Sequence, residues 1–117
     1  MSLAPWITRL FAAIDAQDAE AFAGFLSPDV SFRFGNWEAV EGADQTQAVV
    51  AGFFSSIQAL SHDIRDAWRD GDKVACHGTV RYTRHDGSAL TVPFANLFRM
   101  DGERIGEYLI FSDMSQL

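Results

Sequence analysis

The stretch "YTRHDGSALTVPFANLFRMDG", residues 82–102, decides the fold, because it holds one strand between two tight turns. From Leu90 to Met100 every second residue is apolar apart from Asn96, the pattern of a strand with one buried face. An Asp-Gly pair stands on each side, at residues 86–87 and 101–102. This pair is the strongest short-range signal for a hairpin. The stretch therefore predicts the middle of an antiparallel meander.

The same signals continue toward both ends of the chain. A further Asp-Gly turn lies in "RDGDK", residues 69–73, and upstream "VSFRF", residues 30–34, alternates as another strand would. The strands expected in the second half are 61–69, 73–84, 90–100 and 104–114. They form four consecutive antiparallel strands, which the earlier strand joins.

Three helices are expected in the first half. Pro5 suits the first position of a helix, Asp18 can cap a second one that ends at "SPD", residues 27–29, and a third begins near Gly42. Their expected apolar stripes are Ile7, Leu10, Phe11 and Ile14; then Phe22, Phe25 and Leu26; then Val49, Phe53, Ile57 and Leu60. Helices followed by a meander predict an α+β fold, in which a curved antiparallel sheet wraps around three N-terminal helices.

Composition limits the classes of function. The 117 residues suffice for a single domain, 1–117, and 48% of them are hydrophobic. A net charge of −7, with nine basic residues scattered among sixteen acids, argues against nucleic acid. No apolar run approaches the length that a membrane span needs, and Met1 leads directly into an amphipathic segment, so the cytoplasm is expected. The residue spacings predict no metal site and no cofactor.

Several segments together resemble a known superfamily. These are "DAQDAEAFAGFLSPDVSFRF" at residues 15–34, the third helix that begins at Gly42, the opening stretch, and the terminal "GERIGEYLIFSD" at 102–113. They resemble the nuclear transport factor 2-like superfamily, in its SnoaL-like branch, which is ketosteroid isomerase-like and polyketide cyclase-like. The resemblance implies a cone-shaped, cystatin-like α+β barrel with a pocket at its wide end and dimers formed through the outer sheet face. Because this fold hosts isomerases, dehydratases, cyclases, epoxide hydrolases and non-catalytic modules, it does not fix a function.

The catalytic residues of two superfamily members are mostly absent. By resemblance, Leu10 stands where ketosteroid isomerase has its tyrosine, Phe34 where it has its base, and Asn96 where it has a protonated acid. The positions of the Asp-Arg-Asp set of limonene epoxide hydrolase hold Gly78, Val80 and Ile110. Neither reaction is therefore expected, although the amide of Asn96 retains a hydrogen-bond donor for a substrate oxygen.

Strand parity predicts the composition of the pocket. Its expected walls are Leu10, Phe32, Phe34, Cys76, Phe94 and Ile110, with Trp37 at the mouth. If the turn at 69–73 pairs Trp68 with Val74, the first meander strand adds His62 and Asp66 to the same face. The polar groups of the pocket are then His62, Asp66, Asn96 and Tyr108. The expected ligand is a small, apolar organic molecule.

His62 is the expected proton acceptor, because imidazole gains and loses a proton near neutral pH. Asp66 lies four residues along the same strand, about 13 Å away, so it cannot bond to His62. Asn96 or Tyr108 would stabilise negative charge on a substrate oxygen. Structural roles stay open beside these: Asn96 bonded to Tyr108 or water, His62 to backbone, Asp66 in a turn, and Cys76 and Tyr108 as packing residues.

The outer sheet face carries an apolar centre with a charged rim. The centre comprises Ala95, Leu97, Leu109 and Phe111, and the rim pairs Arg81 and Arg99 with Glu107 and Asp113. Such a patch predicts a homodimer.

Two classes of function remain at this point. The first is a SnoaL-like isomerase, cyclase or dehydratase that transfers a proton on a carbonyl-bearing, cyclic substrate. The alternative is a non-catalytic ligand-binding or dimeric interaction module, which the losses at Leu10 and Phe34 favour.

Overall fold

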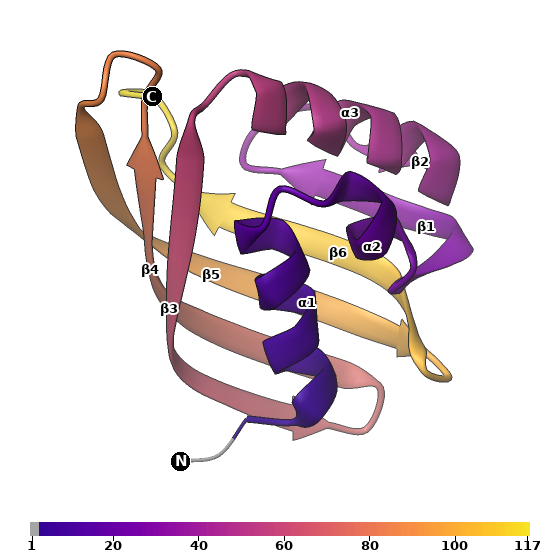
Figure 1. Ribbon diagram of the computed structural model, residues 1–117. Coiled ribbons are helices and arrows are strands. Elements are labelled where there is room, and N and C mark those ends of the chain that lie inside the picture. The colour runs from indigo at the N-terminus through magenta and orange to yellow at the C-terminus, as the bar shows by residue number, and fades with distance from the viewer. Residues whose placement is uncertain (1–2) are drawn as a thin grey trace.

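The structure is a computed structural model that describes residues 3–117, with three helices and six strands. The helices are α1 (Pro5–Asp15), α2 (Ala19–Ala23) and α3 (Ala43–Ser55). The strands are β1 (Leu26–Phe34), β2 (Val40–Glu41), β3 (Ala59–Asp70), β4 (Lys73–Thr83), β5 (Ala89–Asp101) and β6 (Arg104–Ser112). Figure 1 shows α1 lying across the concave side of the curved sheet, with α2 and α3 covering its upper part.

The six strands form one curved, unclosed sheet in the order β2-β1-β6-β5-β4-β3. The expected meander is confirmed, since β3 to β6 pair with their neighbours in antiparallel fashion. The earlier strand joins the meander in parallel, however, with Phe32 beside Tyr108 and Phe34 beside Ile110. Because these residues share the concave face with Asn96, β1 supplies one wall of the interior. The expected α+β fold is thus confirmed.

The first two helices begin where the sequence indicates. Pro5 is the first residue of α1, whose stripe of Ile7, Leu10, Phe11 and Ile14 is buried. Asp18 caps α2, because its carboxylate accepts a hydrogen bond from the backbone N–H of Ala21 at 3.0 Å.

The expected stripe of α3 is wrong in part. The helix ends at Ser55 and buries Thr46, Val50 and Phe54, so the true stripe is turned by one position from Val49 and Phe53. Ile57 and Leu60 are buried but lie beyond the helix. The segment "SPD" belongs to β1, which starts at Leu26 and bends between Leu26 and Ser31.

A β-bulge in β3 overturns the expected register. Ile64 pairs with Gly78 and Asp66 with His77, which leaves Arg65 as an extra residue between them. Trp68 therefore pairs with Ala75 and not with Val74. His62 keeps its place on the concave face, whereas the placement of Asp66 in the pocket is wrong: Asp66 lies on the convex face, because a bulge reverses the faces beyond it.

Gly78 makes the bulge sterically possible. A Cβ atom at this position would lie 1.9 Å from the backbone oxygen of Asp63 and 2.9 Å from the backbone nitrogen of Arg65. Only glycine allows so close an approach between β3 and β4.

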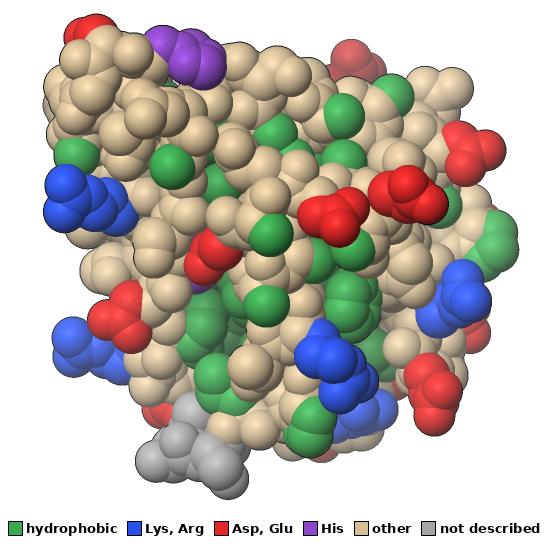
Figure 2. All heavy atoms as spheres, viewed as in Figure 1, with side chains coloured by type: hydrophobic (Ala, Val, Ile, Leu, Met, Phe, Trp, Pro, Cys, Tyr) green, Lys and Arg blue, Asp and Glu red, His purple; other side chains and the backbone are tan. Residues whose placement is uncertain are grey.

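Two further features of the fold are the distribution of its charged side chains and the hydropathy of its helices. On the face shown in Figure 2, acidic and basic side chains are interspersed and do not gather into one basic patch. Within residues 3–117, none of the helices has the length and hydropathy that a bilayer crossing requires.

Candidate ligand pocket

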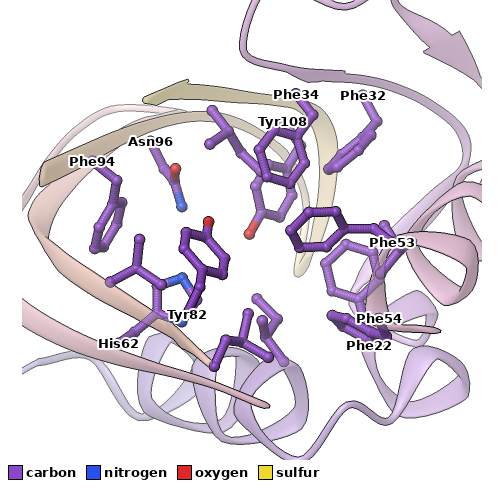
Figure 3. A pocket seen from close by; sticks show the side chains of 15 residues that line it. Phe22, Phe32, Phe34, Phe53, Phe54, His62, Tyr82, Phe94, Asn96 and Tyr108 are labelled. Atoms are coloured by element: carbon purple, nitrogen blue, oxygen red, sulfur yellow. The ribbon is translucent and has the colours of Figure 1, made fainter. Parts of the chain in front are cut away.

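A small cavity lies between the concave face of the sheet and the helices (Figure 3). Its lining is predominantly aromatic: Phe22, Phe32, Phe34, Phe53, Phe54, Tyr82, Phe94 and Tyr108, with Ile14, Val50, Leu60, Val80 and Ile110, and with His62 and Asn96 as further polar residues. The cavity has a volume of about 40 Å³, counted as the space that the centre of a water molecule can occupy. That is room for a few waters, at about 10–15 Å³ each by this measure. A ring-sized ligand therefore needs the walls to move.

Three aromatic rings cover one side of this cavity. The centroid of Phe34 lies 4.9 Å from that of Phe53 and 5.2 Å from that of Trp37. Trp37 is 48% exposed and does not line the cavity itself. Phe34 and Phe53 thus line the cavity on this side, Trp37 packs on Phe34 from outside the lining, and Phe53 is only partly buried.

His62 is held by an aspartate that sequence reasoning missed. Oδ1 of Asp15 lies 2.6 Å from Nδ1 of His62, and Oδ2 of the same carboxylate accepts a hydrogen bond from the His62 backbone N–H at 2.9 Å. A carboxylate at Nδ1 favours the tautomer with its proton there, which leaves Nε2 as the free acceptor. No pattern in the sequence links Asp15 to His62, because the contact depends on how the end of α1 packs on β3.

The imidazole of His62 also has little freedom to turn. Its centroid lies 4.9 Å from that of Phe11 and 5.1 Å from that of Phe94. Packing between two rings and bonding to Asp15 together fix the direction in which Nε2 faces.

Two tyrosine hydroxyls point into the cavity in Figure 3, those of Tyr82 and Tyr108. Burial raises the pKa of both phenols well above the usual value, so both hydroxyls stay protonated as hydrogen-bond donors. Sequence reasoning missed Tyr82, although it continues the inward parity of Val74, Cys76 and Val80 and so gave a usable signal.

Asn96 lies on the same wall and is 2% exposed. Its Oδ1 atom has no hydrogen-bond partner within residues 3–117, and Figure 3 shows the amide nitrogen turned toward the cavity. The bond between Asn96 and Tyr108 that the sequence left open is not formed among these residues. Cys76 pairs with Asn96 from β4, and burial raises the pKa of its thiol to about 12, so the thiol stays neutral.

The structure brings seven of the eleven expected site residues to this cavity and leaves four away from its lining. Those that line it are Phe32, Phe34, His62, Phe94, Asn96, Tyr108 and Ile110. Leu10 and Cys76 are buried in the surrounding core, Trp37 lies outside Phe34, and Asp66 is on the convex face. Within the described residues, no three His, Cys, Asp or Glu side chains gather as a metal ion requires.

Several solved structures share this fold. A protein from Catenulispora acidiphila with a ketosteroid isomerase-like fold, in complex with trimethylamine, matches with a TM-score of 0.89 and 21% identity over 97% of this chain and 89% of that one. A protein from Jannaschia named as a SnoaL-like polyketide cyclase matches with a TM-score of 0.81 and 22% identity over 98% and 92%. TerC, co-crystallised with polyporic acid, matches with a TM-score of 0.81 and 19% identity over 93% and 89%.

Sequence comparison gives the family. No curated protein matches the chain. The family of SnoaL-like domains, however, matches residues 7–108, which is most of the length of this chain. This protein therefore belongs to the family of SnoaL-like domains.

Proposed function

We propose that this protein is an enzyme that moves a proton on a small, carbonyl-bearing, cyclic substrate, with His62 as the base. The reaction class is isomerisation, cyclisation or dehydration. One observation carries the proposal: a histidine with its Nδ1 bonded to Asp15 lines the same cavity as two neutral phenols and an amide. An oriented base and preformed oxyanion donors are the two parts that enolisation needs.

The steps follow from the positions of these groups. Nε2 of His62 takes the proton from the carbon next to the carbonyl, and the electron pair of that C–H bond forms a C=C bond as the carbonyl oxygen becomes an enolate. Tyr82, Tyr108 or the amide of Asn96 donates a hydrogen bond to this oxygen. The carboxylate of Asp15 stabilises the imidazolium. Return of the proton to another carbon completes an isomerisation, and its transfer to a departing hydroxyl completes a dehydration.

The amide oxygen of Asn96 has no hydrogen-bond partner among residues 3–117, which supports a ligand site rather than a closed core. A buried acceptor without a partner costs about 1–3 kcal/mol. Because the amide nitrogen of Asn96 is the atom turned toward the cavity, a ligand that accepts a hydrogen bond from it would use a polar residue that costs stability in the fold itself.

Hydrogen exchange at carbon tests the reaction class before any substrate is known. A panel of small cyclic ketones in D₂O is followed by NMR for loss of the protons next to the carbonyl. The wild type is expected to accelerate exchange of at least one ketone, and His62→Gln to lower that acceleration by a factor on the order of 10²–10⁴. His85→Gln is the matched control, because His85 is exposed and, among the described residues, its ring bonds to the Ser55 carbonyl alone, at 2.9 Å. Equal rates in wild type and His62→Gln would refute the proposed role of His62.

A non-catalytic binding module is the second candidate. Eight aromatic rings around a small cavity, in a chain of charge −7, suit a small alkylammonium ion, which aromatic faces attract. The neighbour in complex with trimethylamine supports this candidate. Titration with trimethylammonium, followed by NMR, tests it. Phe53→Leu is expected to weaken binding by about 1 kcal/mol, roughly fivefold, while Phe111→Leu on the convex face leaves it unchanged; binding without any carbon exchange favours this candidate over the enzyme.

We also propose that two copies pair through the convex face of the sheet. Trp68, Leu97 and Phe111 are 55%, 45% and 53% exposed there. Leu97 lies beside Leu109, and Ala95 beside Phe111, so the apolar side chains are contiguous across β5 and β6. A contiguous apolar patch of this kind is typical of a subunit interface. Arg99 lies opposite Glu107 at its edge, although they form no ion pair in the part of the chain described.

A further inference from the structure

Gln17 has a backbone conformation that glutamine rarely adopts. Its φ is +56°, the only positive value at a non-glycine position within residues 3–117. It follows the end of α1, where Asp18 N–H bonds to the Ala13 carbonyl at 3.0 Å and Gln17 N–H to the Ile14 carbonyl at 2.9 Å. This pair of bonds is the Schellman arrangement, in which the left-handed position is usually glycine. A glutamine here needs a reason other than backbone preference.

The side chain supplies that reason. Nε2 of Gln17 donates a hydrogen bond at 3.0 Å to the backbone carbonyl of Phe54, in the last turn of α3. The same carbonyl accepts a longer hydrogen bond, at 3.4 Å, from the backbone N–H of Ile57, just beyond the end of α3. The Gln17–Phe54 bond joins the end of α1 to the end of α3, 37 residues later in the chain, while Phe54 itself lines the cavity.

Asp15 lies two residues before Gln17, at the last position of α1. Its carboxylate reaches across to β3, where it bonds to both the backbone and the ring of His62. Any rotation or fraying of the last turn of α1 moves this carboxylate. The Gln17–Phe54 bond gives the end of α1 a second attachment, in addition to the two bonds between Asp15 and His62.

We propose that Gln17 is a positioning residue, which acts through Asp15 to hold the Nδ1 proton of His62. It touches neither the cavity nor a substrate. The inference concerns the geometry of the Asp15–His62 pair and stands whichever function the pocket has.

NMR of labelled protein tests the inference without a substrate. The readout is the rate at which the Nδ1 proton of His62 exchanges with water, together with the midpoint of unfolding in urea. Gln17→Gly keeps the left-handed backbone at no steric cost and removes only the side-chain hydrogen bond to the Phe54 carbonyl. We expect faster exchange of the Nδ1 proton, on the order of fivefold as for one lost hydrogen bond, with an unfolding midpoint that does not fall.

Faster exchange of the Nδ1 proton without a lower unfolding midpoint distinguishes positioning of Asp15 from a general stabilisation of the fold. Gln17→Glu keeps the size of the side chain and removes the donor, so it is expected to speed the exchange as well. Gln58→Ala is the matched control near the end of α3, since its exposed side chain forms no hydrogen bond with the described residues. If Gln17→Gly does not fold, Gln17→Asn takes its place, because asparagine adopts the left-handed region more readily.

An exchange rate in Gln17→Gly or Gln17→Asn equal to that of the wild type would overturn the inference. So would an equal acceleration in Gln58→Ala. Neither outcome bears on the ketone exchange by His62, and loss of the proposed reaction in His62→Gln alone leaves the role of Gln17 standing.

Discussion

The carboxylate of Asp15 bonds to His62 at two atoms: Oδ1 lies 2.6 Å from the ring Nδ1, and Oδ2 lies 2.9 Å from the backbone nitrogen. The carboxylate thereby aligns the strand and the imidazole at once. Although Asp15 retains some exposure, with a side chain that is 29% accessible against 10% for His62, two hydrogen bonds to one carboxylate are directional enough to fix the tautomer.

The first prediction concerns this pair. Asp15→Ala is expected to lower the free energy of unfolding by about 2 kcal/mol, because hydrogen bonds to a charged group contribute about 1.5–3 kcal/mol. Without the carboxylate, His62 should no longer favour the tautomer protonated at Nδ1, and this appears as a change in the ¹⁵N shifts of its ring. Asp63→Ala on the exposed side of the same strand is the control. Unchanged ring shifts in Asp15→Ala would contradict the proposed orientation of Nε2.

The second prediction concerns Asn96. Asn96→Leu replaces a buried amide, whose oxygen has no partner among the described residues, with an apolar side chain of similar size. The free energy of unfolding is therefore expected to rise by about 1–2 kcal/mol. Binding of any ligand that bonds to the amide should weaken at the same time. Urea unfolding measures the first effect and NMR titration the second. A less stable Asn96→Leu would mean that the amide is satisfied in the folded protein.

The third prediction is alkaline unfolding. The native pKa values of Tyr82, Tyr108 and Cys76 are raised by burial, so the folded protein holds protons that the unfolded chain releases near pH 9–10. Stability is therefore complete below this range and falls as pH rises through it. Because the chain has only these two tyrosines, tyrosinate absorbance should appear together with the loss of circular dichroism. A rise in absorbance near pH 10 with native circular dichroism would contradict the buried placement.

The fourth prediction concerns Gly78. Its missing Cβ would meet the Asp63 oxygen at 1.9 Å, so Gly78→Ala is expected to lower the free energy of unfolding by about 3 kcal/mol or to prevent folding. Gly52→Ala is the matched control, since nothing lies within 4 Å of a Cβ there, and helix propensity predicts a gain of about 0.5–1 kcal/mol. Urea unfolding compares the two variants. Equal stability of Gly78→Ala and wild type would mean that the bulge is absent in solution.

The fifth prediction concerns the convex face. Leu97→Arg places a charge in the apolar centre and is expected to shift the protein from dimer to monomer in sedimentation equilibrium. Thr91→Arg, an exposed position farther along β5, is the control. Ligand binding in the cavity should survive, because Leu97 faces away from it. A wild type that is monomeric at all concentrations would refute the dimer.

The sequence predicted the fold because its signals are local. Asp-Gly turns, alternation in the strands and the caps at Pro5 and Asp18 each act within a few residues. The same parity predicted that His62, Asn96 and Tyr108 face one interior. It failed for Asp66, because the bulge depends on the contact between Gly78 and β3, which no local pattern reveals.

The pair of Asp15 and His62 was beyond sequence reasoning for a related reason. The two residues are 47 positions apart and meet only when α1 packs on the sheet. Nothing in the neighbourhood of Asp15 distinguishes it from other acids at the end of a helix. Contacts made by the packing of whole elements are not contained in the periodicity of either one.

The bulge at Arg65 has an evolutionary consequence. The extra residue in β3 brings the backbone of Asp63 and Arg65 close to position 78, which is possible only because Gly78 has no side chain. A change in either feature alone would therefore destabilise the fold. Deletion of Arg65 would restore a regular ladder, and position 78 would then tolerate a side chain that points inward. Among homologues, an insertion in β3 and a glycine in β4 should thus be inherited together, whereas lineages without the insertion are free to place a functional side chain at that position.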